Sequence, residues 1–118
     1  MELIEFFVKL QQQFRTLHWE TKSYARHKAY GDIYGSLDDL IDTFMETHMG
    51  KYGRPQFDTV SIELKSMKNL KINDFITESI NFLNGLTQEL SENDTDLLNI
   101  RDEMLGELNK LKYLLTLK

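Results

Sequence analysis

Two histidines and two carboxylates near the start of the sequence have the side-chain types of a metal site. His18 and His27 lie nine residues apart, and Asp42 and Glu46 lie four residues apart. Residues four apart on a helix share one face, with about 6 Å between them along the axis, so the two carboxylates would be neighbours. Two imidazoles and two carboxylates are suitable ligands for Fe(II), Mn(II) or Zn(II).

Spacing along the chain prevents one copy from assembling this site. His27 and Asp42 are 15 residues apart in a segment with a helical pattern, which separates them by about 22 Å. No single ion bridges that distance. A second copy must therefore bring its Asp42 and Glu46 to His18 and His27 of the first copy. Two antiparallel helices related by a two-fold axis would form two such sites.

Four segments have apolar residues at intervals of three and four, which is the pattern of amphipathic helices. Leu3, Phe7 and Leu10 begin such a series in the first segment. The pattern predicts helices over residues 2–22, 24–49 and about 74–91, and from residue 95 nearly to the C-terminus.

The second and third predicted helices are joined by about 20 residues, far more than a turn between neighbouring helices requires. Gly50, Gly53 and Pro55 are expected to end the second helix, and Asn73 is expected to cap the third. We expect residues 50–71 to run the length of a bundle, with at most one short helix among them. The predicted fold is all-α, a ferritin-like four-helix bundle with a long crossover between its second and third helices.

Composition limits the classes of protein further. The 118 residues make a single domain, residues 1–118, and the lack of Cys excludes disulfide scaffolds, zinc ribbons and thiolate clusters. Fourteen Lys and Arg against 19 Asp and Glu give a net charge of −5, and an acidic surface without a pattern argues against nucleic-acid binding. No apolar run is long enough to span a membrane. Acidic residues at the start, where a signal peptide has basic ones, predict an unprocessed cytoplasmic protein.

A di-iron centre inside one bundle is not expected. Such centres in ferritin-like bundles use a Glu-x-x-His pair on each of two helices. This sequence contains three histidines and no Glu-x-x-His. Any metal site built on His18 and His27 must therefore follow another plan.

The histidine pattern resembles that of the mini-ferritins, the family of the DNA-binding protein from starved cells. The shared residues are His18-Trp19 and His27, followed at +10, +15, +16 and +19 by Leu37, Asp42, Thr43 and Glu46. Asp94-Thr95 and Tyr113-Leu114-Leu115 are similar to the start and end of the family's fourth helix. A still closer likeness, over residues 18–29, is to a group of small phage and viral proteins.

The resemblance implies an iron protein that oxidises Fe(II) with peroxide or oxygen at sites between subunits. It implies that His18, His27, Asp42 and Glu46 are the catalytic and metal-binding residues, with iron as the metal and Zn or Mn as alternatives. The partner is then a second copy, in a two-fold dimer or in a cage of twelve subunits that stores Fe(III).

Two departures from the family's pattern change these expectations. The family has an Asp four residues after its second His, and Gly31 takes that place here, which leaves Asp32 as a weaker candidate ligand. The lysine-rich N-terminal tail is missing, so nucleic acid is not an expected partner.

Other interpretations of the same residues stay open. The chain could be a non-catalytic oligomerisation or interaction protein of a phage or virus, in the host cytoplasm, with a vestigial or structural metal site. Trp19 would be a packing anchor near the site or a radical quencher, and His48 a core or crossover contact. Gly31 and Gly35 indicate either close approach of another helix or a loosely packed helix start. Four tyrosines favour an interface, namely Tyr24, Tyr30, Tyr34 and Tyr52.

Overall fold

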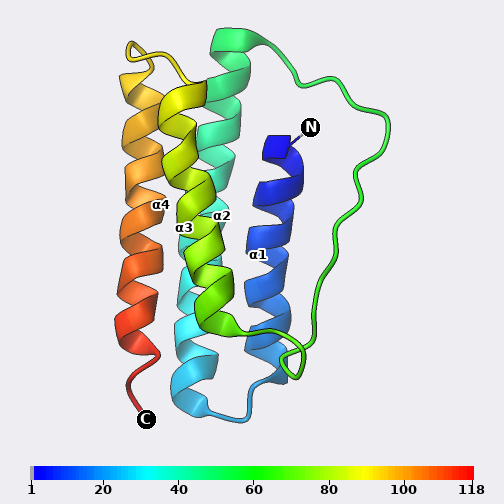
Figure 1. Cartoon of the computed structure of the whole chain (residues 1–118), viewed down its shortest axis with the longest axis vertical. Coiled ribbons are helices and arrows are strands. Elements are labelled where there is room, and N and C mark those ends of the chain that lie inside the picture. Colours follow the sequence, from blue (N-terminus) through cyan, green and yellow to red (C-terminus); the bar gives the residue numbers. More distant parts are fainter. Residues whose placement is uncertain (1) are drawn as a thin grey trace.

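The computed structural model describes residues 2–118 as four helices packed side by side. The helices are α1 (Glu2–Glu20), α2 (Tyr24–Tyr52), α3 (Ile72–Glu89) and α4 (Thr95–Leu114). Short turns join α1 to α2 and α3 to α4, whereas residues 53–71 run along the bundle beside α1 (Figure 1). Ferritin-like bundles have this connectivity. The predicted four-helix bundle with one long crossover is therefore confirmed.

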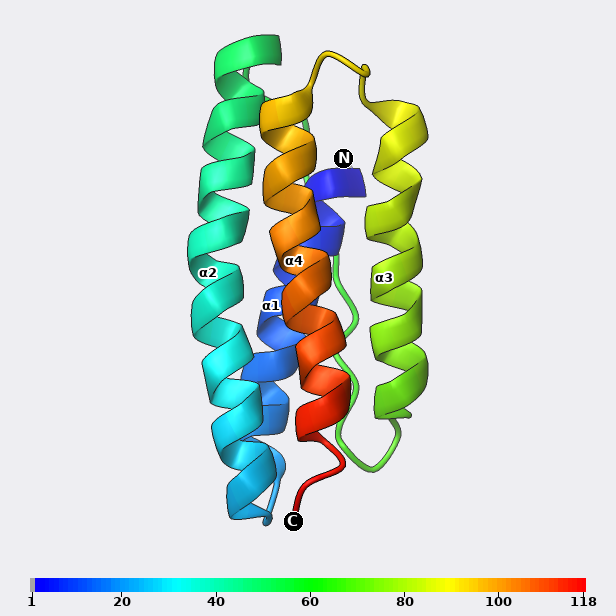
Figure 2. The same cartoon turned by 90° about the vertical axis from the view of Figure 1, so that its left-hand side faces the viewer.

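Apolar side chains from all four helices form the core. Phe7 and Phe14 of α1, Phe44 of α2 and Met104 of α4 are almost completely buried. The rings of Phe7 and Phe44 meet edge to face with 5.3 Å between centroids, a geometry that aromatic pairs favour. Burial of each such side chain stabilises the fold by about 1.5–3 kcal/mol. α2 packs against both α1 and α4, while α3 packs mainly on α4, which lies between α2 and α3 in Figure 2.

Several helix ends differ from the prediction. α2 continues through Gly50 and ends at Tyr52; Gly53 caps it, with a φ of 86° in the left-handed region that favours glycine. The predicted cap at Asn73 is wrong, because α3 already begins at Ile72, whose side chain packs against the core. Lys71 takes the N-cap position without a side-chain hydrogen bond. α1 and α3 each end two residues earlier than predicted, at Glu20 and Glu89. No helix within residues 2–118 has the length and apolarity needed to cross a membrane.

The second half of the crossover is attached to α1. Gln13 is completely buried; its Nε2 donates to the Lys65 carbonyl oxygen at 2.8 Å, and its Oε1 accepts from the Lys65 amide at 2.9 Å. The Met67 amide donates to the Glu20 carboxylate at 3.1 Å. A single turn at residues 66–70 stands where the sequence allowed a short helix. The Gln13 side chain thus fixes the register of the crossover against α1.

A second polar cluster ties the end of α2 to the turn between α3 and α4. The buried Asp94 carboxylate pairs with Lys51 Nζ at 2.7 Å and accepts from the Tyr52 hydroxyl at 2.6 Å and the Ser91 amide at 2.9 Å. The hydrogen bond from Lys51 and, as the next largest cause, that from Tyr52 lower the pKa of Asp94 to about 2. The same bonds raise the pKa values of Lys51 and Tyr52. These contacts hold the last turn of α2, which explains why the helix continues past Gly50.

Charged residues are separated between the two ends of the bundle. We call the end with the α1–α2 turn, the start of α3 and the end of α4 the basic end, and the opposite end the acidic end (Figure 1). The basic end carries ten of the 14 basic residues, namely Arg15, Lys22, Arg26, Lys28, Lys65, Lys68, Lys71, Lys110, Lys112 and Lys118. The acidic end carries 13 of the 19 acidic residues, namely Glu2, Glu5, Asp39, Asp42, Glu46, Asp58, Glu63, Glu89, Glu92, Asp94, Asp96, Asp102 and Glu103.

Each end also carries a smaller number of residues of the opposite charge. Five acids lie at the basic end, four bases lie at the acidic end, and Asp38 lies midway, so the formal charges of the two ends are +5 and −9. The expectation of an acidic surface without a pattern is therefore wrong.

Replacing Gln13 by Ala is expected to release the crossover from α1. The change leaves the amide and carbonyl groups of Lys65 without their partner, and the free energy of unfolding in urea should fall by about 1–3 kcal/mol. Proteolysis within residues 54–65 should also become faster. Gln88→Ala, at an exposed position of α3, is the control. Equal losses in the two variants would show that the Gln13–Lys65 pair contributes nothing specific.

We also expect acid to weaken the link between α2 and the α3–α4 turn. The pKa of Asp94 is lowered from 3.8 to about 2 on folding, so the unfolded chain takes up this proton first. The contribution to stability is present above about pH 4 and is lost as the pH falls towards 2. Asp94→Asn should lower the Tm at pH 7 and flatten its decline between about pH 4 and pH 2. Asp58→Asn, at an exposed crossover position, should change neither the Tm at pH 7 nor its decline in acid. If Asp94→Asn leaves that decline unchanged, other carboxylates cause it.

Candidate functional site

His18 and His27 form a reciprocal pair where α1 meets α2. His18 Nδ1 lies 2.8 Å from the carbonyl oxygen of His27, and His27 Nδ1 lies 2.9 Å from the carbonyl oxygen of His18. Since a carbonyl oxygen only accepts, each Nδ1 carries its proton, and the Nε2 of each neutral ring keeps a lone pair. The two half-buried rings stack with 3.9 Å between centroids and 17° between planes.

The turn between α1 and α2 brings the two histidines together. α1 ends at Glu20, and the Ser23 amide donates to Thr21 Oγ at 3.2 Å. Ser23 then caps α2, because its Oγ accepts from the Arg26 amide at 3.2 Å. With only three residues between the helices, the last turn of α1 lies beside the first turn of α2.

The histidine pair has the hydrogen bonding of metal-binding imidazoles. A histidine ligand usually donates its other ring N–H to a carbonyl or carboxylate group, as both rings do here. Lone pairs lie in the ring planes, and two nearly parallel rings 3.9 Å apart do not aim at one point about 2.1 Å from each nitrogen. The rings must tilt to share one ion, or each ring serves its own ion.

Gly31 has a steric role that the sequence did not reveal. A Cβ built on Gly31 would lie 2.9 Å from both Cε1 and Nδ1 of the His18 ring. Any side chain at this position, including the Asp of the mini-ferritin pattern, therefore requires the ring to move. The His18 ring can therefore lie where it does only because residue 31 has no side chain.

The two predicted carboxylate ligands lie together on the exposed face of α2. Asp42 and Glu46 are both exposed and make no ion pair within residues 2–118. A hydrogen bond to Asp42 and its negative charge raise the pKa of Glu46. Two carboxylates without a basic partner among the described residues 2–118 are well suited to take a cation from solution.

The predicted residues therefore fall into two half-sites, the His18–His27 pair where α1 meets α2 and the Asp42–Glu46 pair farther along α2. The helix separates His27 from Asp42 by about 22 Å. Within residues 2–118, no group of three His, Asp or Glu side chains from one chain is placed to hold a metal ion. Asp32 is exposed beside Gly31 and joins neither pair.

The aromatic residues near the histidines lie differently from the expectation. Trp19 is 65% exposed, so it is no packing anchor of the core, and the Arg15 guanidinium lies 4.9 Å from its ring centroid. Arg15 also lies 4.8 Å from the Tyr34 ring, which places it between two aromatic rings. Tyr30 is buried against Phe14 and is not available to an interface.

The remaining histidine and tyrosines lie outside the pair. The His48 ring lies at the far end of α2, between Phe44 and Tyr52. Tyr24 and Tyr52 are exposed, but at opposite ends of α2.

Substitutions of two glycines on α2 test the steric role of Gly31. Gly31→Ala pushes a methyl group into the His18 ring, which costs about 1–3 kcal/mol as overpacking. Gly35→Ala adds the same methyl group where nothing lies within 4 Å, so it should raise stability by up to about 1 kcal/mol through helix propensity. In urea titrations of dilute, metal-free protein, Gly31→Ala should be the less stable variant by about 1–3 kcal/mol. Equal stabilities would mean that the His18 ring moves aside freely.

Comparison with known proteins identifies a phage protein as a relative of the chain. It is 33% identical to the "Uncharacterized 14.6 kDa protein in mobD-ri intergenic region" of Enterobacteria phage T4, over 118 residues that cover 99% of this chain and 88% of the phage protein. No solved structure matches the chain. A family model, described as a family of unknown function (DUF5856), matches residues 18–115, which include both half-sites. The chain belongs to this family.

Proposed function

We propose that the chain is a mini-ferritin-type protein that oxidises Fe(II) at sites formed between two copies. The observation that carries the proposal is the position of Gly35 on α2. Gly35 is exposed, and a Cβ added there would meet nothing within 4 Å. It lies midway along the helix between His27 and the Asp42–Glu46 pair. Two antiparallel α2 helices that cross at Gly35 would place each carboxylate pair level with the histidine pair of the other copy.

Charge on this face of α2 supports a role for a cation in such a pairing. Asp32, Asp39, Asp42 and Glu46 flank Gly35 at intervals of three and four, so they share its face, and all four are exposed. None makes an ion pair within residues 2–118. Lys28, four residues before Asp32, is the one base that α2 places on this face, so two such faces carry an excess of negative charge and would repel each other unless cations lay between them. We therefore expect two copies to pair through α2 only when a divalent ion is present.

The donor atoms fit Fe(II) as a substrate. Nε2 of His18 and of His27 would bind it from one copy, and the carboxylates of Asp42 and Glu46 would bind it from the other, with Asp32 as a weaker addition. Carboxylates favour the higher charge of Fe(III), and Zn or Mn would suit the same donors. Two Fe(II) ions give up one electron each, and one peroxide takes the two electrons and two protons to become two waters. If the pairs assemble into a closed shell, its acidic lining would hold Fe(III); a dimer would only oxidise iron.

Mixing two inactive variants tests whether the site is shared. Apo-protein would be titrated anaerobically with Fe(II), pulsed with peroxide and followed by Fe(III) absorbance. His27→Gln and Glu46→Gln should each lose more than about tenfold in rate. After refolding together in equal amounts, half of the dimers combine both variants and have one intact site of two, so about a quarter of the wild-type activity should return.

Matched substitutions control for general damage to the helices. His48→Gln changes a histidine at the far end of α2, and Glu103→Gln changes an exposed glutamate of α4. Both should oxidise Fe(II) at the wild-type rate. Sedimentation above about 0.3 M salt, with and without anaerobic Fe(II), should show pairing only with the ion. Wild-type protein that oxidises Fe(II) no faster than buffer would reject the proposal.

A non-catalytic interaction protein is the second candidate, and the packing at Gly31 favours it. The His18 ring fills the space that the family's Asp side chain would need, at 2.9 Å from a Cβ built on Gly31. The stacked histidines would then be a structural feature or hold a structural Zn(II). The phage relative fits either candidate, and for both we place the protein in the host cytoplasm. Tight Zn(II) binding without any Fe(II) oxidation would decide for this alternative.

A further inference from the structure

The C-terminal segment, residues 110–118, combines basic and exposed apolar side chains. Lys110, Lys112 and Lys118 are exposed, and none makes an ion pair within residues 2–118. Tyr113 is 63% exposed and Leu117 is 47% exposed. Large apolar side chains between unpaired lysines are typical of a segment that docks on an acidic surface with an apolar floor.

Such a surface lies between α1 and α3. Phe6 of α1 stacks on Phe82 of α3 with 3.8 Å between centroids and 12° between planes. Two adjoining hollows of about 290 and 130 Å³ share Phe6, Lys9 and Phe82 as lining residues. We call these two hollows the α1–α3 groove.

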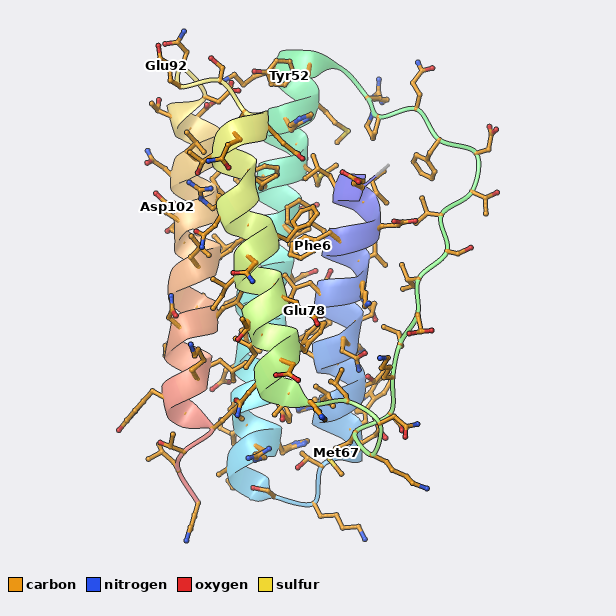
Figure 3. All side chains as sticks on the ribbon, in the orientation of Figure 1. Phe6, Tyr52, Met67, Glu78, Glu92 and Asp102 are labelled. Carbon is orange, nitrogen blue, oxygen red and sulfur yellow. The ribbon has the colours of Figure 1, made fainter. Side chains whose placement is uncertain are left out.

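Carboxylates surround this groove. Glu2, Glu5 and Glu63 line the larger hollow, and Glu78 lines the smaller one, against the single base Lys9. In Figure 3, Phe6 and Glu78 lie on the same side of the molecule, between α1 and α3. The groove thus joins aromatic surface to an excess of negative charge.

The segment and the groove of one chain cannot meet in the fold described. The C-terminus lies at the basic end, whereas Glu2 and Glu5 lie towards the other end, in a molecule 42 Å long (Figure 1). Four residues follow α4, and they extend no further than about 14 Å. Only the C-terminal segment of another molecule can reach this groove.

We propose that the C-terminal segment of one copy docks in the α1–α3 groove of a second copy, so that molecules associate head to tail. The lysines of the segment would face the carboxylates of the groove, while Tyr113 and Leu117 would cover the aromatic floor. The ends of the molecule, at +5 and −9, orient two copies in the same sense. The contact joins two different surfaces, so it closes into a ring or continues as a chain. It does not rest on the proposed iron chemistry and uses no residue of the α2 face.

Charge exchange between the two surfaces tests the contact. Sedimentation velocity of full-length protein in EDTA should show association at about 20 mM salt that weakens above about 0.3 M salt. Lys112→Glu with Lys118→Glu, or Glu5→Lys with Glu63→Lys, should each weaken association at least about tenfold. An equimolar mixture of the two double variants should associate again, because the unaltered segment of the groove variant then meets the unaltered groove of the segment variant.

Controls separate docking from general attraction between charged ends. Lys22→Glu with Lys68→Glu changes the same charge at the basic end but outside the C-terminal segment, and both residues are exposed. This variant should associate more strongly than the Lys112→Glu, Lys118→Glu variant. Equal weakening of the two, failure of the mixture to associate, or a monomeric wild type at low salt would overturn the proposal. His27→Gln should associate as wild type does, whatever its effect on Fe(II) oxidation.

Discussion

The length and rigidity of α2 keep the histidine pair and the Asp42–Glu46 pair of one chain apart. Its 29 residues span about 43 Å, the whole bundle. The helix packs against both α1 and α4, so it cannot bend to bring its own polar groups together. His27 near one end and Asp42 beyond the middle stay about 22 Å apart in every state in which the helix is intact. Chemistry that needs both groups must therefore come from an assembly of two chains.

Close packing at Gly31 determines where the His18 ring lies. Without a side chain at Gly31, the His18 ring lies against the α2 backbone and stacks on His27. The two Nδ1–H groups then bond to the carbonyl oxygens of the opposite residues, which fixes both rings before any ion binds. The pair thereby links the end of α1 to the start of α2.

Helix patterns and the long connection were sufficient to predict the bundle, because period and length depend on local sequence. The same patterns were not sufficient to predict the exact helix ends, because distant residues determine them. Asp94, for example, holds the last turn of α2, some 40 residues earlier in the chain. The two half-sites followed from spacing on α2, but the stacking of His18 on His27 depends on how α1 packs against α2. The role of Gln13 in holding the crossover could not be predicted, since nothing in the sequence links Gln13 to the backbone of Lys65.

The net charge of −5 did not predict how charge is distributed over the surface, because the two ends of the bundle carry +5 and −9. The excess of +5 at the basic end arises outside the helices, because the helix halves at this end carry five bases and five acids. It comes from the turn between α1 and α2, the second half of the crossover and the residues after α4, namely Lys22, Lys65, Lys68, Lys71 and Lys118. A net negative charge normally keeps molecules apart by repulsion, but a charge dipole attracts them in one orientation. Cation-dependent pairing through α2 would add a symmetric contact to this directional one. Two contacts of different symmetry are the minimum from which a closed shell can be built, whereas either alone gives a dimer, a ring or a chain.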